Sequence, residues 1–77
     1  MFKVKLDIDN IKIFLVEVMK IDSDVSLVSG KYVVNAKSIM GIYSLDLSNP
    51  IDVVLEEEAE SECETLYNRL KELNIAI

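Results

Sequence analysis

The segment that decides the fold covers residues 24–45 and reads Asp-Val-Ser-Leu-Val-Ser-Gly-Lys-Tyr-Val-Val-Asn-Ala-Lys-Ser-Ile-Met-Gly-Ile-Tyr-Ser-Leu. It begins with two runs rich in β-branched residues, 24–28 and 31–36, which are typical of strands. Ser29 and Gly30 lie between these runs and form a short turn, because glycine tolerates a positive φ angle. The two runs are therefore predicted to form a β-hairpin.

The second half of this segment predicts a short helix. Its apolar residues have helical spacing: Ile39, Ile42, Tyr43 and Leu45. The hydroxyl of Ser38 is placed to cap the first turn. Gly41, inside the helix, indicates either close packing or a distorted turn. We therefore expect the hairpin to lead directly into a helix at about residue 38.

The residues before the hairpin predict a strand and a helix. Residues 2–7 alternate apolar with charged side chains, which is the pattern of a half-buried strand. Over about residues 10–20 the apolar side chains recur three and four positions apart, as on one face of a helix. They are Ile11, Phe14, Leu15, Val18 and Met19. Asp9 or Asn10 is expected to cap this helix.

The residues after the short helix complete the order of elements. Residues 51–56 predict a strand and residues 59–74 a helix with an apolar stripe. The stripe consists of Cys63, Leu66, Tyr67, Leu70 and Leu73. The order β-α-β-β-α-β-α predicts an α+β open-faced sandwich, with a four-stranded antiparallel sheet and three helices on one face. At this length one domain, residues 1–77, is expected.

The composition argues against several classes of protein. Cys63 is the only cysteine and there is no histidine, so we expect no disulfide, no metal site and no cofactor. The chain has no Ser/His pair and no glycine-rich phosphate loop, so we expect no enzyme. The first residues lack the apolar run of a secretory signal, and no segment has the roughly 20 apolar residues of a membrane span. A cytoplasmic protein is therefore expected.

The acidic residues gather in the C-terminal third. The net charge is −6, and residues 51–77 hold eight acidic residues against Arg69 and Lys71. This distribution argues against binding of nucleic acid. The simplest explanation of the acids between Glu56 and Glu64 is a solvated helix start, where carboxylates meet the positive end of the helix dipole.

The block Lys37-Ser38-Ile39-Met40-Gly41 resembles the HPr family of the bacterial sugar phosphotransferase system. The hairpin before the block is also similar, and the order of elements agrees over residues 2–73. The resemblance is strongest over residues 22–47, and it implies the HPr fold. In that family the serine of this block is the target of an ATP-dependent kinase. The hydrophobic residues beside the serine contact the kinase and a transcriptional co-regulator.

By this resemblance Ser38 would be a regulatory phosphorylation site. The residues in contact with the protein partners would be Lys37, Ile39, Met40 and Tyr43, and the partners an HPr serine kinase-like enzyme and a transcriptional co-regulator-like protein. A dianionic phosphate is favoured at the beginning of a helix, because unpaired N–H groups point at it. From the residues alone, a helix cap is the favoured explanation of Ser38; once the resemblance is added, a cap and a phosphorylation site explain it equally well.

The chain departs from the family at the phosphate acceptor. Between the first strand and the first helix, the family has a Gly-(Ile/Leu)-His-(Ala/Thr)-Arg-Pro loop, whose histidine takes the phosphate. Residues 6–11 here read Leu-Asp-Ile-Asp-Asn-Ile, a shorter loop without histidine, arginine or proline. Histidine phosphorylation is therefore excluded. An aspartyl phosphate at Asp7 or Asp9 is disfavoured, since such sites normally use a bound metal and a lysine.

Two functions remain open for this sequence. The first is a non-catalytic regulatory binding module, which resembles the histidine-free, catabolite-repression branch of the HPr family. The second is a structural or assembly protein, which forms a homodimer or docks on a larger partner through Ile39, Met40 and Tyr43. The shortened loop after the first strand favours strand exchange between two copies, because short hinges promote domain swapping.

Overall fold

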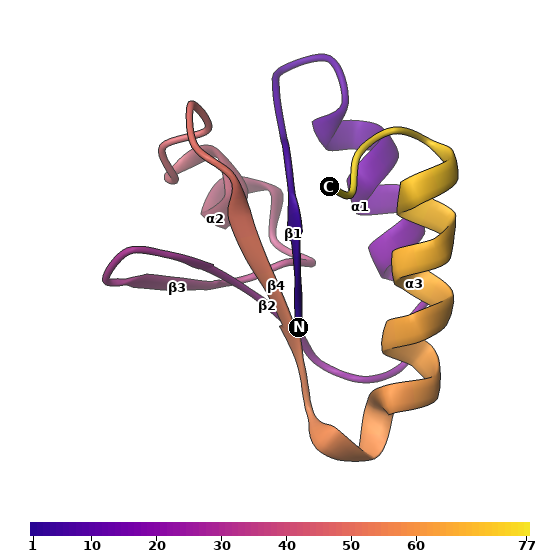
Figure 1. Ribbon diagram of the computed structural model, residues 1–77. Coiled ribbons are helices and arrows are strands. Elements are labelled where there is room, and N and C mark those ends of the chain that lie inside the picture. The colour runs from indigo at the N-terminus through magenta and orange to yellow at the C-terminus, as the bar shows by residue number, and fades with distance from the viewer.

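In the computed structural model, residues 1–77 fold into a four-stranded antiparallel sheet with helices packed against one face (Figure 1). The elements are β1 (Phe2–Val4), α1 (Ile11–Met19), β2 (Val25–Ser29), β3 (Tyr32–Asn35), α2 (Ile39–Tyr43), β4 (Ile51–Leu55), the 3-10 helix η1 (Glu57–Ala59) and α3 (Glu60–Glu72). The predicted element order and the α+β fold class are confirmed.

The sheet has the strand order β1-β4-β2-β3, so β4 and β2 are central and β3 lies at an edge. β4 pairs with β1, where Val4 lies opposite Ile51, and with β2, where Leu27 lies opposite Val53. These four side chains point toward the helices and are fully buried. The alternation that predicts the strands therefore also identifies the core face of the sheet.

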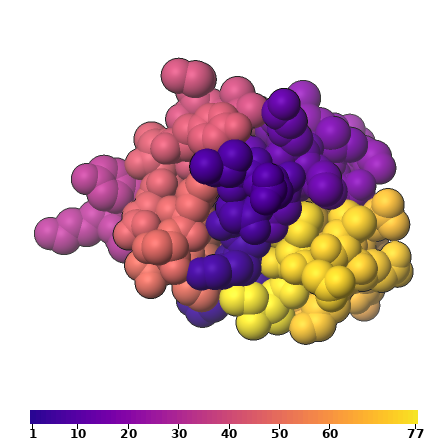
Figure 2. All heavy atoms as spheres, turned by 90° about the horizontal axis from the view of Figure 1, so that it is seen from above, coloured from indigo at the N-terminus to yellow at the C-terminus, as the bar shows by residue number.

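The hairpin of β2 and β3 forms as predicted, with its turn shifted by one residue. Ser29 pairs with Tyr32, so the turn consists of Gly30 and Lys31 rather than Ser29 and Gly30. Gly30 has a φ angle of 59°, which a residue with a side chain rarely adopts. Figure 2 shows the hairpin turn, in magenta, standing out from the body of the molecule.

The first strand covers Phe2–Val4 and is shorter than the predicted range 2–7, and the end of the chain bonds to its outer edge. The N–H of Lys5 donates to the carbonyl of Ile75 over 2.9 Å, and the N–H of Ile77 donates to the carbonyl of Lys3 over 3.0 Å. Asn74, with a φ angle of 61°, turns the chain back after α3. The last residues therefore cover the outer edge of β1, a feature that the sequence pattern does not predict.

α1 and α3 pack side by side on the sheet. α1 buries Ile11, Phe14 and Val18 as predicted, but Met19 is 61% exposed, so its assignment to the buried face is wrong. Each residue of a helix is turned by about 100° from the one before, which carries Met19 away from the face of Val18. None of the helices has the length and apolar character needed to cross a bilayer.

Candidate functional site

Ser38 stands at the junction between β3 and α2. Its backbone is extended, and its N–H donates to the carbonyl of Asn35 over 3.0 Å. Its hydroxyl oxygen accepts a hydrogen bond from the N–H of Gly41 over 3.2 Å. The predicted cap is therefore present, and the hydroxyl is half-buried at the first turn of the helix.

Gly41 permits close packing of α2 against β3. A Cβ atom added at Gly41 would lie 3.3 Å from the Cβ of Val34 and 3.4 Å from the Oγ of Ser38. The distance to Val34 is tighter than most side chains accept, so a larger residue would press on the strand, whereas the distance to Ser38 is an ordinary van der Waals contact. Of the two explanations that the sequence leaves open for Gly41, the structure supports close packing.

The outer face of α2 is apolar. Met40 is 77% exposed and Tyr43 is 47% exposed, and residues three positions apart lie on the same side of a helix. Ile42 points inward and is fully buried, whereas Ile39 is half-buried against the core. Ser38, Met40 and Tyr43 together are called the α2 surface below. The structure thus exposes Met40 and Tyr43 of the predicted contact residues and leaves Ile39 mostly covered.

Lys37 forms an internal contact. Its Nζ donates a hydrogen bond to the backbone carbonyl of Ile21 over 2.7 Å, and the side chain is partly buried. The bond ties the beginning of α2 to the segment between α1 and β2. A role of this kind is not evident from the sequence, which places Lys37 only next to Ser38.

The segment that Lys37 holds is also bound by Glu62 of α3. One carboxylate oxygen of Glu62 accepts from the hydroxyl of Ser23 over 2.6 Å, and the other accepts from the N–H of Asp22 over 3.0 Å. These contacts hold the pKa of Glu62 below its ordinary value. The hydrogen bond from the Ser23 hydroxyl has the largest effect, the N–H of Asp22 comes next, and the charge of Lys37 adds a smaller contribution. Glu62 therefore joins α3 to the segment that lies beside the candidate site.

The loop that carries the phosphate-accepting histidine in the HPr family is here a closed turn. The Oδ1 of Asp7 accepts from the N–H groups of Asp9, over 2.9 Å, and Asn10, over 2.8 Å. In return the side chain of Asn10 accepts from the N–H of Asp7 and donates to the carbonyl of Lys5. Asn10 is the residue before α1, but its side-chain amide is bonded within the loop and makes no hydrogen bond to the helix. The predicted capping bond is therefore absent.

Comparisons with known proteins place the fold in a family. The family model PTS-HPr, described as the PTS HPr component phosphorylation site, matches residues 4–73. A search of curated protein sequences gives no match.

The solved structures include a similar one, the crystal structure of the selenomethionyl catabolite repression protein Crh of Bacillus subtilis. It is 34% identical, with a TM-score of 0.68 over 91% of this chain and 84% of that chain. Crh is described there as an intertwined dimer with a swapped domain. The match to the family model over nearly the whole chain, the identity and the shared fold lead to one conclusion: this chain belongs to the PTS-HPr family, as a member without a histidine.

Proposed function

We propose that this protein is a non-catalytic regulatory module, which binds protein partners through the α2 surface and is controlled by phosphorylation of Ser38. The observation that carries the proposal is the position of the Ser38 hydroxyl at the beginning of the helix that also exposes two apolar side chains, Met40 and Tyr43. Docking on a partner would cover this apolar area. A phosphate at its edge would change the charge of the surface and leave the core in place.

The surroundings of Ser38 indicate how a phosphate would act there. It would add a charge of about −1.5 to −2 at the first turn of α2, where the N–H of Gly41 already points at the Ser38 oxygen. Lys37 is the neighbouring cation, but its ammonium group is bonded to Ile21. The cations that pair with the phosphate would therefore come largely from the partner, as in other phosphoserine sites read by arginine.

The partners follow from family membership. We propose an HPr serine kinase-like enzyme as the source of the phosphate and a transcriptional co-regulator-like protein as the reader of the modified surface, in the cytoplasm. Met40 and Tyr43 are the residues proposed to contact both. Ile39 would contribute through its exposed part, and Lys37 by holding the beginning of α2 in place.

The test is the intact mass of the protein after incubation with HPr serine kinase and ATP. Ser38→Ala is compared with Ser44→Ala, a matched control because Ser44 is an exposed serine at the other end of α2. One phosphate is expected on the wild type and on the Ser44 variant, and none on the Ser38 variant. An unmodified wild type, or a phosphate retained by Ser38→Ala, would contradict the proposal.

A second candidate function is assembly into a dimer by exchange of β1. This strand has three residues, lies at one side of the sheet and is joined to α1 by a short loop. The similar protein Crh is described as an intertwined dimer with a swapped domain, which makes exchange of an element between two copies a reasonable proposal for this chain. A dimer that persists on dilution, in a protein that the kinase leaves unmodified, would favour assembly over regulation.

A further inference from the structure

An open groove of about 730 Å³ lies where β1 begins and where β4 leads into η1 and α3. Its apolar lining consists of Met1, Phe2, Leu55, Cys63 and Tyr67, and its acidic lining of Glu56, Glu57, Glu60 and Glu64. We call it the acidic groove. It shares no residue with the α2 surface.

The apolar lining of the acidic groove is formed by side chains that the fold leaves partly uncovered. The rings of Phe2 and Tyr67 pack edge to face with their centroids 5.2 Å apart. Both are half-buried, as are Leu55 and Cys63. Aromatic rings that are packed on one side and open on the other provide a preformed apolar contact area.

The carboxylates around this lining have no partner in the chain. The ion pairs of the molecule join Lys3 to Asp52, Lys20 to Glu17, and Arg69 to Glu17 and Glu72. No hydrogen bond reaches the side chains of the four groove glutamates, whereas Glu62 on the same helix is bound by Ser23.

The helix dipole accounts for only part of this acidic lining. The dipole favours acids in the first turn, such as Glu60, but its effect fades beyond that turn, where Glu64 lies. It also gives no reason for the apolar side chains between the carboxylates. Four unpaired negative charges around an apolar area are complementary to a cation that lies next to an apolar side chain.

We propose that the acidic groove binds a segment of another protein in which lysine or arginine residues flank an apolar side chain. The apolar side chain covers Phe2, Leu55 and Tyr67, and the cations pair with the carboxylates of Glu60 and Glu64. The proposal is independent of the function proposed for Ser38. The two surfaces share no residue, so binding at the groove does not use the side chains of the α2 surface.

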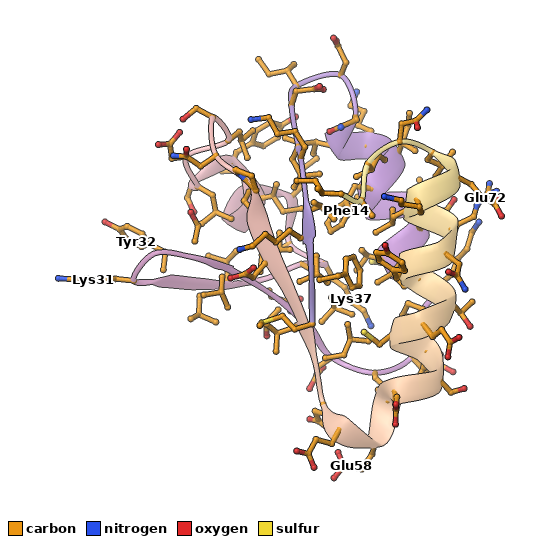
Figure 3. The ribbon with its side chains drawn as sticks, viewed as in Figure 1. Phe14, Lys31, Tyr32, Lys37, Glu58 and Glu72 are labelled. Carbon is orange, nitrogen blue, oxygen red and sulfur yellow. The ribbon has the colours of Figure 1, made fainter.

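A second copy of this chain is a poorer occupant. Its most suitable segment is the hairpin turn, where Lys31 and Tyr32 project into solvent (Figure 3). That turn offers one cation to four carboxylates. Each copy also carries a net charge of −6, so two copies repel each other.

The experiment is a titration of the ¹⁵N-labelled protein with the capped peptide acetyl-Lys-Leu-Phe-Lys-amide, followed by amide chemical shifts at low salt. The control peptide acetyl-Glu-Leu-Phe-Glu-amide has the same apolar residues and the opposite charge. Saturable shifts are expected around Phe2, Cys63 and Tyr67 with the basic peptide only. Shifts that map to another face, or no saturation, or equal binding of the acidic peptide, would overturn the proposal.

Charge variants separate the groove from the overall negative charge. The variant Glu60→Gln/Glu64→Gln removes two groove carboxylates, and Glu58→Gln/Glu72→Gln removes two exposed carboxylates that do not line the groove (Figure 3). The first variant is expected to raise the Kd about fivefold, the effect of losing two exposed ion pairs, and the second to change it little.

If both charge variants raised the Kd for the basic peptide equally, the binding would be explained by the net charge alone, and the proposal would be overturned. Shifts of the groove amides with protein concentration alone would identify a second copy as the occupant, which also contradicts it.

Discussion

The hydroxyl oxygen of Ser38 accepts a hydrogen bond from the N–H of Gly41, so the proposed phosphorylation site is also the N-cap of α2. We expect Ser38→Ala to lower the free energy of unfolding by about 1 kcal/mol, because an N–H of the first turn loses its partner. Ser38→Asp should lower it less, since a carboxylate caps equally well. Urea unfolding followed by circular dichroism measures both. Equal losses in the two variants would contradict the capping role.

Lys37 is expected to act mainly within the fold. Lys37→Met removes the hydrogen bond to the carbonyl of Ile21 and should lower the free energy of unfolding by about 1 kcal/mol. Lys31→Met, at the exposed hairpin turn, is the control and should change stability little. Thermal unfolding of the two variants compares them. Equal stability of both would mean that the ammonium group of Lys37 is free for partners.

The contacts of Glu62 make stability depend on pH. Because the pKa of Glu62 is lowered in the folded state, its contribution to stability is present above its ordinary value of 4.5. That contribution is lost as the pH falls through the lowered folded-state pKa. Glu62→Gln cannot titrate, so it should lose less stability than the wild type between neutral and acid pH. Urea midpoints at the two pH values measure the difference, and equal losses would contradict this account.

The loop around Asp7 is expected to oppose the proposed exchange of β1. Asp7→Ala removes the oxygen that accepts from Asp9 and Asn10, a loss of about 1 kcal/mol for the closed loop of each protomer. An open hinge does not need these bonds, so the dimer fraction should rise. Asp9→Ala is the control, because the Asp9 carboxylate makes no hydrogen bond in the chain. Light scattering after gel filtration measures the dimer, and monomers in all three proteins would contradict the exchange.

The elements with a clear period are the ones that the sequence predicts. The stripe of Leu66 and Leu70 is found where the pattern places it, and the hairpin is found with its turn one residue later than predicted. Residues 75–77, which cover the edge of β1, are too few to have a period. Their position depends on the left-handed turn at Asn74, which only the folded chain reveals.

Only the local features of the candidate site could be predicted from the sequence. The cap at Ser38 follows from local spacing, whereas Met40 is placed on the contact surface by the family resemblance alone. The contact of Lys37 with Ile21 joins residues from different elements, and so does the acidic groove, which brings Phe2 next to Tyr67. Contacts of this kind depend on how β1 and α3 pack, which no local pattern contains.

The central claim is that this member of the PTS-HPr family carries regulatory phosphate on Ser38 and takes no part in the histidine relay. One intact-mass experiment tests it with two donors in parallel, HPr serine kinase with ATP, and the general phosphotransferase enzyme with phosphoenolpyruvate. We predict one acid-stable phosphate from the kinase, absent in Ser38→Ala, and no phosphate from phosphoenolpyruvate, because the chain has no histidine. Phosphate from phosphoenolpyruvate, or none from the kinase, would contradict the account.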